Sequence, residues 1–206
     1  MPQISDIKPQ VKKPGYYNIF VDGKFALALS ELDLVTHQLK LGQQLSQSEL
    51  NDLHQSYTSS KCYNFALRYL SVRPRSVMEV RSYLVRKQFN DVDIDSAISR
   101  LEKSNYLNDS DFASLWVENR MRLNPKSVSV LRAELIKKGI NKDIIDRVIS
   151  NLPPSNQLHG LVAIIESKAR QSRYQDKQKL IEYLARKGYG YGLIKEAFES
   201  TSFYQE

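Results

Sequence analysis

Pairs of adjacent cations stand at equivalent positions three times along this chain. They are Arg86-Lys87, Lys137-Lys138 and Arg186-Lys187, spaced by 51 and then 49 residues. Repeated Lys and Arg residues bind polyanions such as nucleic acid, because each neutralised phosphate releases a counterion. Cations in the last turn of a helix also favour the helix dipole, so a purely structural role for these pairs stays open.

Further cations lie on the segments around the first two pairs. The candidate residues for contact with nucleic acid or with a partner protein are Arg68, Arg73, Arg75, Arg81, Arg86, Lys87, Arg120, Arg122, Lys126, Arg132, Lys137, Lys138, Arg186 and Lys187. Tyr69 and Tyr83 lie among them, and would either stack on bases or pack between helices.

The positive charge is unevenly spread along the sequence. Residues 1–60 hold five Lys and Arg against six Asp and Glu, whereas the remaining residues hold 25 against 17. The excess attracts nucleic acid or an acidic protein surface. A solvated surface that only leans basic would have the same composition.

The sequence offers no constellation for catalysis or for binding a cofactor. It contains no Gly-x-x-x-x-Gly-Lys-Ser/Thr phosphate loop, and its three histidines are scattered. With Cys62 as the one cysteine, no zinc-site spacing exists. Asp91, Asp93 and Asp95 lack the Gly and terminal Glu of a calcium loop, and suit the start of a helix better. We therefore expect a non-enzyme without metal or cofactor.

The composition also predicts where the protein works. A single cysteine excludes an internal disulfide and fits a reducing compartment. The first residues lack the apolar run of a secretory signal, and no stretch approaches 18 apolar residues. We expect a soluble cytoplasmic protein with no membrane partner.

The basic pairs belong to a longer repeat of apolar residues. Its first copy consists of Val80, Leu84, Phe89, Ile94, Ala97 and Ile98. The same spacing recurs in Leu131, Leu135, Ile140, Ile145, Val148 and Ile149, and again in Leu180, Leu184, Tyr189, Ile194, Ala197 and Phe198. Such periodicity indicates small helical units that bury their apolar faces by stacking on their neighbours.

Helix-start signals divide each unit into three helices. Ser76-x-x-Glu79 matches a capping box that opens a helix through Lys87. Asp91 or Asp93 is expected to cap the following helix. Pro153-Pro154-Ser155-Asn156 is predicted to be a linker before the third unit.

A β-hairpin is predicted near the N-terminus. Asp22-Gly23 lies between two β-prone runs, and Gly tolerates the positive φ of a type I′ turn. A two-residue turn would pair Phe20 with Phe25 and Asn18 with Leu27.

Residues 3–8 would add a third strand to this hairpin. Ser30 and Ser46 are predicted helix N-caps, and Ser46-x-x-Glu49 would open a helix that ends at about Tyr57.

The predicted fold class is mainly α. It consists of three tandem three-helix repeats in an elongated array, with a small N-terminal β-hairpin extension. The predicted parts are an N-terminal region over residues 1–58 and repeats over residues 60–108, 109–153 and 157–204.

Three segments of the chain resemble signatures of the RecX family. Residues 65–79 are similar to its A-L-x-x-L-x-x-R-x-R-S-x-x-E-L pattern, residues 105–113 to G-Y-L-N-D-x-x-F-A, and residues 135–140 to L-x-x-K-G-I. Val80 stands where Leu is usual, and Asn105 replaces a Gly. These departures affect turn chemistry more than function.

The resemblance implies a bacterial regulator of the RecA recombinase, with a place in homologous recombination, DNA repair and the SOS response. Such proteins bind RecA filaments on single-stranded DNA, and inhibit ATP hydrolysis, strand exchange and filament growth. The expected partners are thus the RecA filament and single-stranded DNA, with duplex DNA as a further candidate, and the protein is expected to act as a monomer. The alternative is a helical-repeat protein that binds DNA directly and acts without a recombinase.

Overall fold

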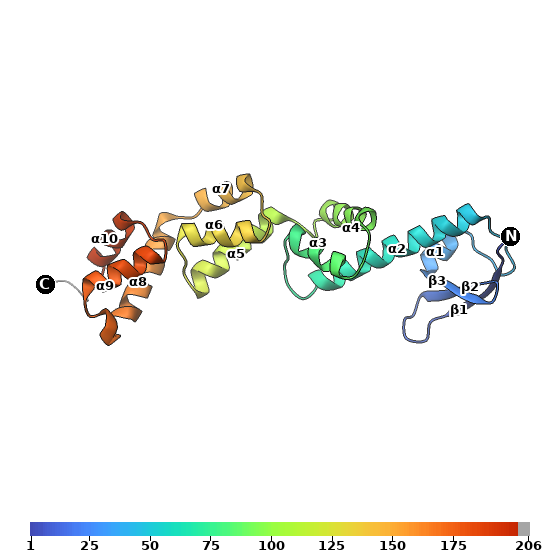
Figure 1. Ribbon diagram of the computed structural model, residues 1–206, viewed down its shortest axis with the longest axis horizontal. Helices are drawn as coiled ribbons and strands as arrows, with labels where there is room; N and C mark the ends of the chain where they lie inside the picture. The colour runs from blue at the N-terminus through green and yellow to red at the C-terminus, as the bar shows by residue number, and fades with distance from the viewer. Residues whose placement is uncertain (202–206) are drawn as a thin grey trace. The chain divides into compact units, whose positions relative to one another are not determined.

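The computed structural model describes residues 1–201, which form one small β-sheet, ten α-helices and one short 3₁₀ helix (Figure 1). The chain divides into two compact units. The first contains residues 1–71 and 83–103, and the second contains residues 72–82 and 104–206. The predicted end of the third repeat at residue 204 lies outside the described residues.

The N-terminal sheet has three antiparallel strands in the order β1-β2-β3, and the predicted third strand is confirmed. The strands are β1 (Ile4–Pro9), β2 (Tyr16–Val21) and β3 (Lys24–Ser30). Its core contains the buried side chains of Ile4, Ile19, Leu27 and Leu29.

Asp22 and Gly23 form the predicted tight turn, with φ angles of 48° and 76°. Phe20 pairs with Phe25 as predicted, and their rings meet edge to face at 6.0 Å. The predicted partner of Asn18 is wrong by one residue, because the register shifts at Phe20 and Asn18 pairs with Ala28.

Two helices complete the first part of the chain, α1 (Glu31–Thr36) and α2 (Gln47–Leu70). The predicted N-caps at Ser30 and Ser46 are both confirmed as capping boxes. The predicted helix end near Tyr57 is wrong, because α2 continues to Leu70. Residues 47–70 contain neither Gly nor Pro, so nothing in the local sequence stops the helix. This long helix packs against β3 and against the last helix of the first repeat.

The three predicted three-helix repeats are confirmed (Figure 1). The first contains the end of α2 with α3 (Val77–Arg86) and α4 (Asp91–Lys103); the second contains α5 (Asp109–Leu123), α6 (Val128–Lys137) and α7 (Lys142–Ser150). The third contains α8 (Pro154–Ala169), the 3₁₀ helix η1 (Ser172–Tyr174), α9 (Lys177–Arg186) and α10 (Tyr191–Glu199).

The predicted linker at residues 153–156 is wrong, because Pro154 is the first residue of α8. Proline is favoured at the first helical position, where its missing N–H and fixed φ cost nothing. The second and third repeats therefore follow one another with little chain between their helices.

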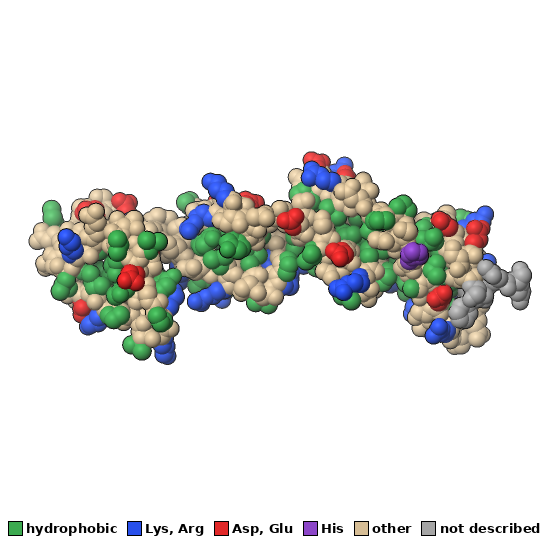
Figure 2. All heavy atoms as spheres, turned by 180° about the vertical axis from the view of Figure 1, so that it is seen from behind, with side chains coloured by type: hydrophobic (Ala, Val, Ile, Leu, Met, Phe, Trp, Pro, Cys, Tyr) green, Lys and Arg blue, Asp and Glu red, His purple; other side chains and the backbone are tan. Residues whose placement is uncertain are grey.

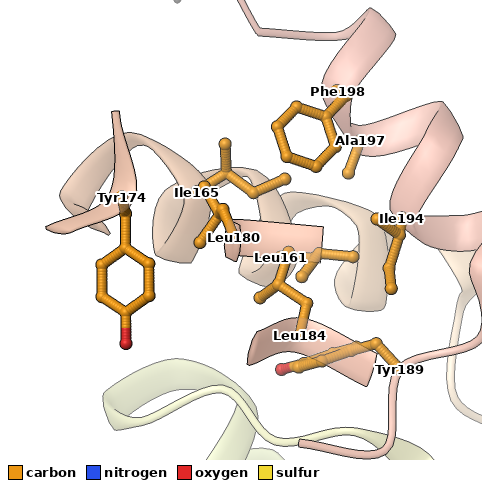
Figure 3. Packing of buried hydrophobic residues seen from close by; sticks show 9 residues of the cluster. All are labelled: Leu161, Ile165, Tyr174, Leu180, Leu184, Tyr189, Ile194, Ala197 and Phe198. Carbon is orange, nitrogen blue, oxygen red and sulfur yellow. The ribbon is translucent and has the colours of Figure 1, made fainter. Parts of the chain in front are cut away.

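The recurring apolar residues form the cores of their repeats. In the second repeat, Leu131, Leu135, Ile140, Ile145 and Ile149 are buried together with residues of α5. In the third, all six predicted residues are buried in one cluster with Leu161, Ile165 and Tyr174. Figure 3 shows this cluster, in which Tyr189 lies next to Leu184.

The start of α4 differs in detail from the prediction. Its N-cap is Asn90, whose Oδ1 accepts a hydrogen bond of 2.8 Å from the Asp93 N–H. Asp93 is fully buried, and its carboxylate accepts bonds of 2.8 Å from both Gln55 and Asn90. The prediction that Asp91 or Asp93 caps this helix is therefore wrong. Asp93 instead joins α4 to α2.

Gln88 occupies a backbone conformation that favours glycine. Its φ is 63°, and the equivalent residues of the other repeats are Gly139 and Gly188, with φ of 77° and 84°. A left-handed conformation costs a residue with a Cβ about 1–2 kcal/mol. We expect Gln88→Gly to raise the free energy of unfolding by about 1 kcal/mol in urea titrations. Gln88→Ala retains the Cβ, and an equal gain from that variant would contradict the explanation.

Candidate nucleoprotein interface

The three basic pairs all stand at the C-terminal end of the second helix of a repeat. Arg86, Lys137 and Arg186 are the last helical residues and are exposed. Lys138 and Lys187 are the C-cap residues of α6 and α9. Among the second members of the pairs, only Lys138 is half-buried, whereas Lys87 and Lys187 are exposed like the first members.

Consecutive repeats meet at these C-caps through a serine hydroxyl. Ser76 Oγ donates a hydrogen bond of 2.7 Å to the Lys138 carbonyl oxygen, and Ser127 Oγ donates an equal bond to that of Lys187. Both serines are buried N-cap residues. We call the contact around Ser76 and Lys138 the first joint, and that around Ser127 and Lys187 the second joint.

A glycine follows the lysine at each joint, and both approach the preceding repeat closely. A Cβ on Gly139 would lie 2.5 Å from the Met78 Cβ, and one on Gly188 would lie 2.8 Å from the Ser127 Oγ. The Lys-Gly sequence after each second helix thus has a packing role. The first member of each basic pair has no such explanation.

At the first joint, Glu79 neutralises two of the candidate cations. Its Oε1 lies 3.0 Å from Arg73 Nη2 and 2.6 Å from Lys138 Nζ. The predicted capping box is confirmed, because Glu79 also accepts the Ser76 N–H at 3.3 Å. Burial opposes the charge on Glu79, but hydrogen bonds from Arg73, Lys138 and Ser76 outweigh it and lower its pKa to about 2.

Trp116 on α5 lies among the same charges. Its Nε1 donates to Glu134 Oε2 at 2.8 Å, and Arg120 Nε donates to the same oxygen at 2.8 Å. The Arg120 guanidinium lies 4.6 Å from the Trp116 ring centroid, and Lys138 Nζ lies 4.9 Å from it. The structure therefore brings Lys138 and Arg120 together around one aromatic ring.

The other candidate cations have varied surroundings. Arg132 forms an ion pair with Asp146, and its hydrogen bond lowers the pKa of that carboxyl group. Arg186 lies 4.0 Å from Glu182, a distance typical of a weak surface pair. Arg122 donates to Asn119 at 3.3 Å. Lys87 lies 5.7 Å from the Tyr83 ring.

The exposure of the 14 candidates separates them into two groups. Exposed are Arg68, Arg73, Arg86, Lys87, Arg122, Lys137, Arg186 and Lys187; half-buried are Arg75, Arg81, Arg120, Lys126, Arg132 and Lys138. On the face drawn in Figure 2, basic side chains form small groups among acidic and hydrophobic ones. Contact of these residues with DNA or with a partner protein stays a prediction.

Tyr69 and Tyr83 stack on each other, with ring centroids 4.1 Å apart and an angle of 7° between the rings. This geometry confirms the helix-packing interpretation of the two tyrosines, because each ring already covers one face of the other.

An open cavity of about 410 Å³ lies at the second joint. Lys126, Lys168, Lys187 and Tyr183 are among the residues that line it. Tyr189 also lines the cavity and donates its hydroxyl to the Pro125 carbonyl oxygen at 3.3 Å. Burial, with a smaller contribution from Tyr183, raises the pKa of Tyr189 to about 12, so its hydroxyl remains a neutral donor.

Sequence reasoning missed Lys168, since α8 carries no basic pair and Lys168 has no counterpart among the candidates of the other repeats. It also missed the joints themselves. Their signal was present in the sequence: Ser76 and Ser127 are 51 residues apart, and Gly139 and Gly188 are 49 residues apart.

Cys62 is fully buried, and burial followed by the charge of Asp93 raises the pKa of its thiol to about 11. The thiol is thus a packed, unreactive group, as predicted.

Among residues 1–201, no group of three or more His, Cys, Asp and Glu side chains is arranged to hold a metal ion. None of the described helices combines the length and apolarity needed to cross a membrane.

The fold and the joints define a tandem three-helix repeat protein, and comparisons identify its family. The N-terminal domain model of regulatory protein RecX matches residues 2–46. The first, second and third three-helix domains of RecX match residues 62–101, 108–149 and 162–198. The chain belongs to the RecX family of regulatory proteins.

Individual relatives match along nearly the whole chain. Regulatory protein RecX of Bacillus pumilus is 33% identical over 210 residues, which cover 100% of this chain and 80% of the relative. RecX of Listeria monocytogenes serotype 4a is 31% identical, with 97% and 76% covered. A crystal structure of RecX from Lactobacillus salivarius gives a TM-score of 0.63 at 27% identity over 69% of this chain and 96% of that one. Another RecX crystal structure gives a TM-score of 0.75 at 24% identity, over 95% of this chain and 100% of that one, and has the same fold.

Proposed function

We propose that this chain is a non-enzymatic regulator that binds RecA filaments on single-stranded DNA. It inhibits ATP hydrolysis by RecA, strand exchange and filament growth, and it acts as a cytoplasmic monomer. The observation that carries the proposal is the match to RecX regulatory proteins over the N-terminal domain and all three repeats.

The distribution of charge supports a polyanionic or acidic binding partner. Several cations form ion pairs with carboxylates of the same chain, among them Arg73, Lys138 and Arg120. Arg86 and Lys137, by contrast, are exposed and form no ion pair within the described part of the chain. These two side chains remain available to phosphates or to carboxylates of RecA.

ATP hydrolysis by RecA on single-stranded DNA tests the proposal. Increasing amounts of this chain are expected to lower the steady-state rate and to shorten the lifetime of the filament. An unchanged rate together with an unchanged filament lifetime would overturn the proposed function.

The exposed cations are tested by the double variant Arg86→Ala/Lys137→Ala. We expect its half-inhibitory concentration to rise by about tenfold, and the salt slope of binding to fall by roughly two, as for two lost phosphate contacts. Its melting temperature should stay within a few degrees, since exposed charges of this kind contribute about 0–1 kcal/mol. Lys12→Ala/Lys24→Ala removes two exposed charges from the N-terminal region and serves as the control. An equal loss in that control would show that only net charge matters.

Direct binding to DNA without a recombinase is the alternative, and the excess of Lys and Arg in the repeats favours it. Binding to bare duplex, bare single strands and RecA-coated single strands should be compared at physiological salt. Preference for the bare duplex would support this alternative over regulation of RecA.

A further inference from the structure

The cavity at the second joint is lined by several basic side chains and by no acidic one among the described residues. The basic side chains are those of Lys126, Lys168 and Lys187. Lys168 Nζ lies 3.5 Å from the neutral Gln171 Oε1. Lys126 and Lys187 form no ion pair within residues 1–201. Three like charges around one hollow repel each other, and an anion would relieve that repulsion.

At the first joint, the lysine equivalent to Lys187 is neutralised by a carboxylate of the protein itself. There Glu79 lies 2.6 Å from Lys138, which corresponds to Lys187. The residue equivalent to Glu79 at the second joint is Val130, which also lines the cavity. The second joint therefore keeps the lysine of the first joint but has an apolar residue in place of its carboxylate.

An aromatic ring accompanies the lysines. Lys168 Nζ and Lys187 Nζ each lie 5.6 Å from the centroid of Tyr183. The neighbouring ring of Tyr174 is tilted by 52° relative to Tyr183, so it does not cover a face in parallel, as Tyr69 does for Tyr83. Nucleobases stack on such rings, while lysines bind the adjoining phosphates.

We propose that this cavity binds a nucleotide of single-stranded nucleic acid. The phosphate lies among Lys126, Lys168 and Lys187, and the base lies against Tyr183. A volume of about 410 Å³ is within the range of small-ligand sites. This inference rests on the proposed function insofar as it assigns the single strand of the filament as the ligand.

The test measures binding of fluorescently labelled oligothymidylate to the full-length chain by anisotropy. We expect Lys168→Glu/Lys187→Glu to weaken binding by at least about 30-fold and to reduce the salt slope by roughly two. The matched control is Lys179→Glu/Lys195→Glu, which makes the same charge change at exposed sites of the same repeat. An equal loss in the control would overturn the site. If the charge reversal impairs folding, Lys168→Gln/Lys187→Gln removes the two charges without reversing them and tests the same contact.

Substitutions of Tyr183 test the aromatic contact separately, because they leave the charge of the site unchanged. Tyr183→Leu is expected to weaken oligothymidylate binding by about tenfold with an unchanged salt slope, and Tyr183→Phe to restore it. Competition with thymidine monophosphate and with inorganic phosphate distinguishes the possible sources of the phosphate. Competition by the monophosphate at micromolar concentration would identify a free-nucleotide site and would overturn the assignment to a strand.

The failure of this inference is distinguishable from failure of the proposed function. If both lysine variants and Tyr183→Leu bind oligothymidylate like the unaltered chain, the cavity is not the nucleotide-binding site. This conclusion does not depend on the rate of ATP hydrolysis by RecA. If those variants lose binding to poly-glutamate but retain the oligonucleotide, the cavity takes an acidic protein segment and the inference is likewise overturned. The proposed function is tested separately, by measuring ATP hydrolysis by RecA in the presence of the unaltered chain.

Discussion

Gly139→Ala is expected to lower the free energy of unfolding by about 2–5 kcal/mol. Gly139 has a φ of 77°, a conformation that costs a residue with a Cβ about 1–2 kcal/mol. The new Cβ would also lie 2.5 Å from the Met78 Cβ, and overpacking of that kind costs about 1–3 kcal/mol. Because Met78 Cβ is attached directly to the backbone of α3, a change of side-chain rotamer cannot relieve the contact. Urea denaturation of the full chain measures the change.

Two further variants separate the causes of this effect. Gly192→Ala places its Cβ in open space within the first turn of α10, where Ala favours the helix over Gly, and is expected to leave stability unchanged or slightly improved. Met78→Gly/Gly139→Ala removes the clash but retains the backbone strain, so a loss of about 1–2 kcal/mol relative to Met78→Gly should remain. If Gly139→Ala proves as stable as Gly192→Ala relative to the unaltered chain, the first joint is not closely packed.

The repeats could be predicted because their cores are encoded in apolar spacing. Leu131, Leu135 and Ile145 are buried at the positions that the pattern assigned to them, and the capping box at Ser76 forms from residues three apart. These features depend on residues close in sequence, within one unit of about 50 residues. Interactions between residues this close in sequence can be predicted from the sequence alone.

The errors arose where a contact distant in sequence, or a permissive local sequence, decided the outcome. Asp93 is buried on Gln55, which is 38 residues away, and Asn90 takes the capping role. Pro154 begins a helix rather than a linker, because proline is allowed at a first helical position and the core of the third repeat needs α8.

The candidate site shows the same limit. The basic pairs were visible as a repeat, but their neutralisation was not, because Glu79 reaches Lys138 across 59 residues of sequence. The same lysine repeats at position 187 without its carboxylate. Sequence alone therefore predicted a row of equivalent cations, whereas the structure separates those that serve the first joint from those left with uncompensated charge.

Glu79→Gln is expected to lower the free energy of unfolding by about 2 kcal/mol at neutral pH. The Glu79 side chain is 16% exposed and accepts charged hydrogen bonds from Arg73 and Lys138. Bonds to charged groups contribute about 1.5–3 kcal/mol, and their loss leaves the half-buried Lys138 unpaired. The amide of Gln still accepts hydrogen bonds, which limits the loss to the lower part of that range.

The pH dependence of the same variant identifies the cause. Folding lowers the pKa of Glu79 from 4.5 to about 2, so its contribution is fully present above pH 4.5 and is lost as the pH falls towards 2. The stability difference between the unaltered chain and Glu79→Gln should therefore be constant from pH 7 to 5 and shrink steadily below pH 4.5. Glu182→Gln is the control, since Glu182 is 56% exposed and lies 4.0 Å from Arg186. A difference that persists unchanged at pH 2 would mean that Glu79 acts through its shape and packing rather than through its charge.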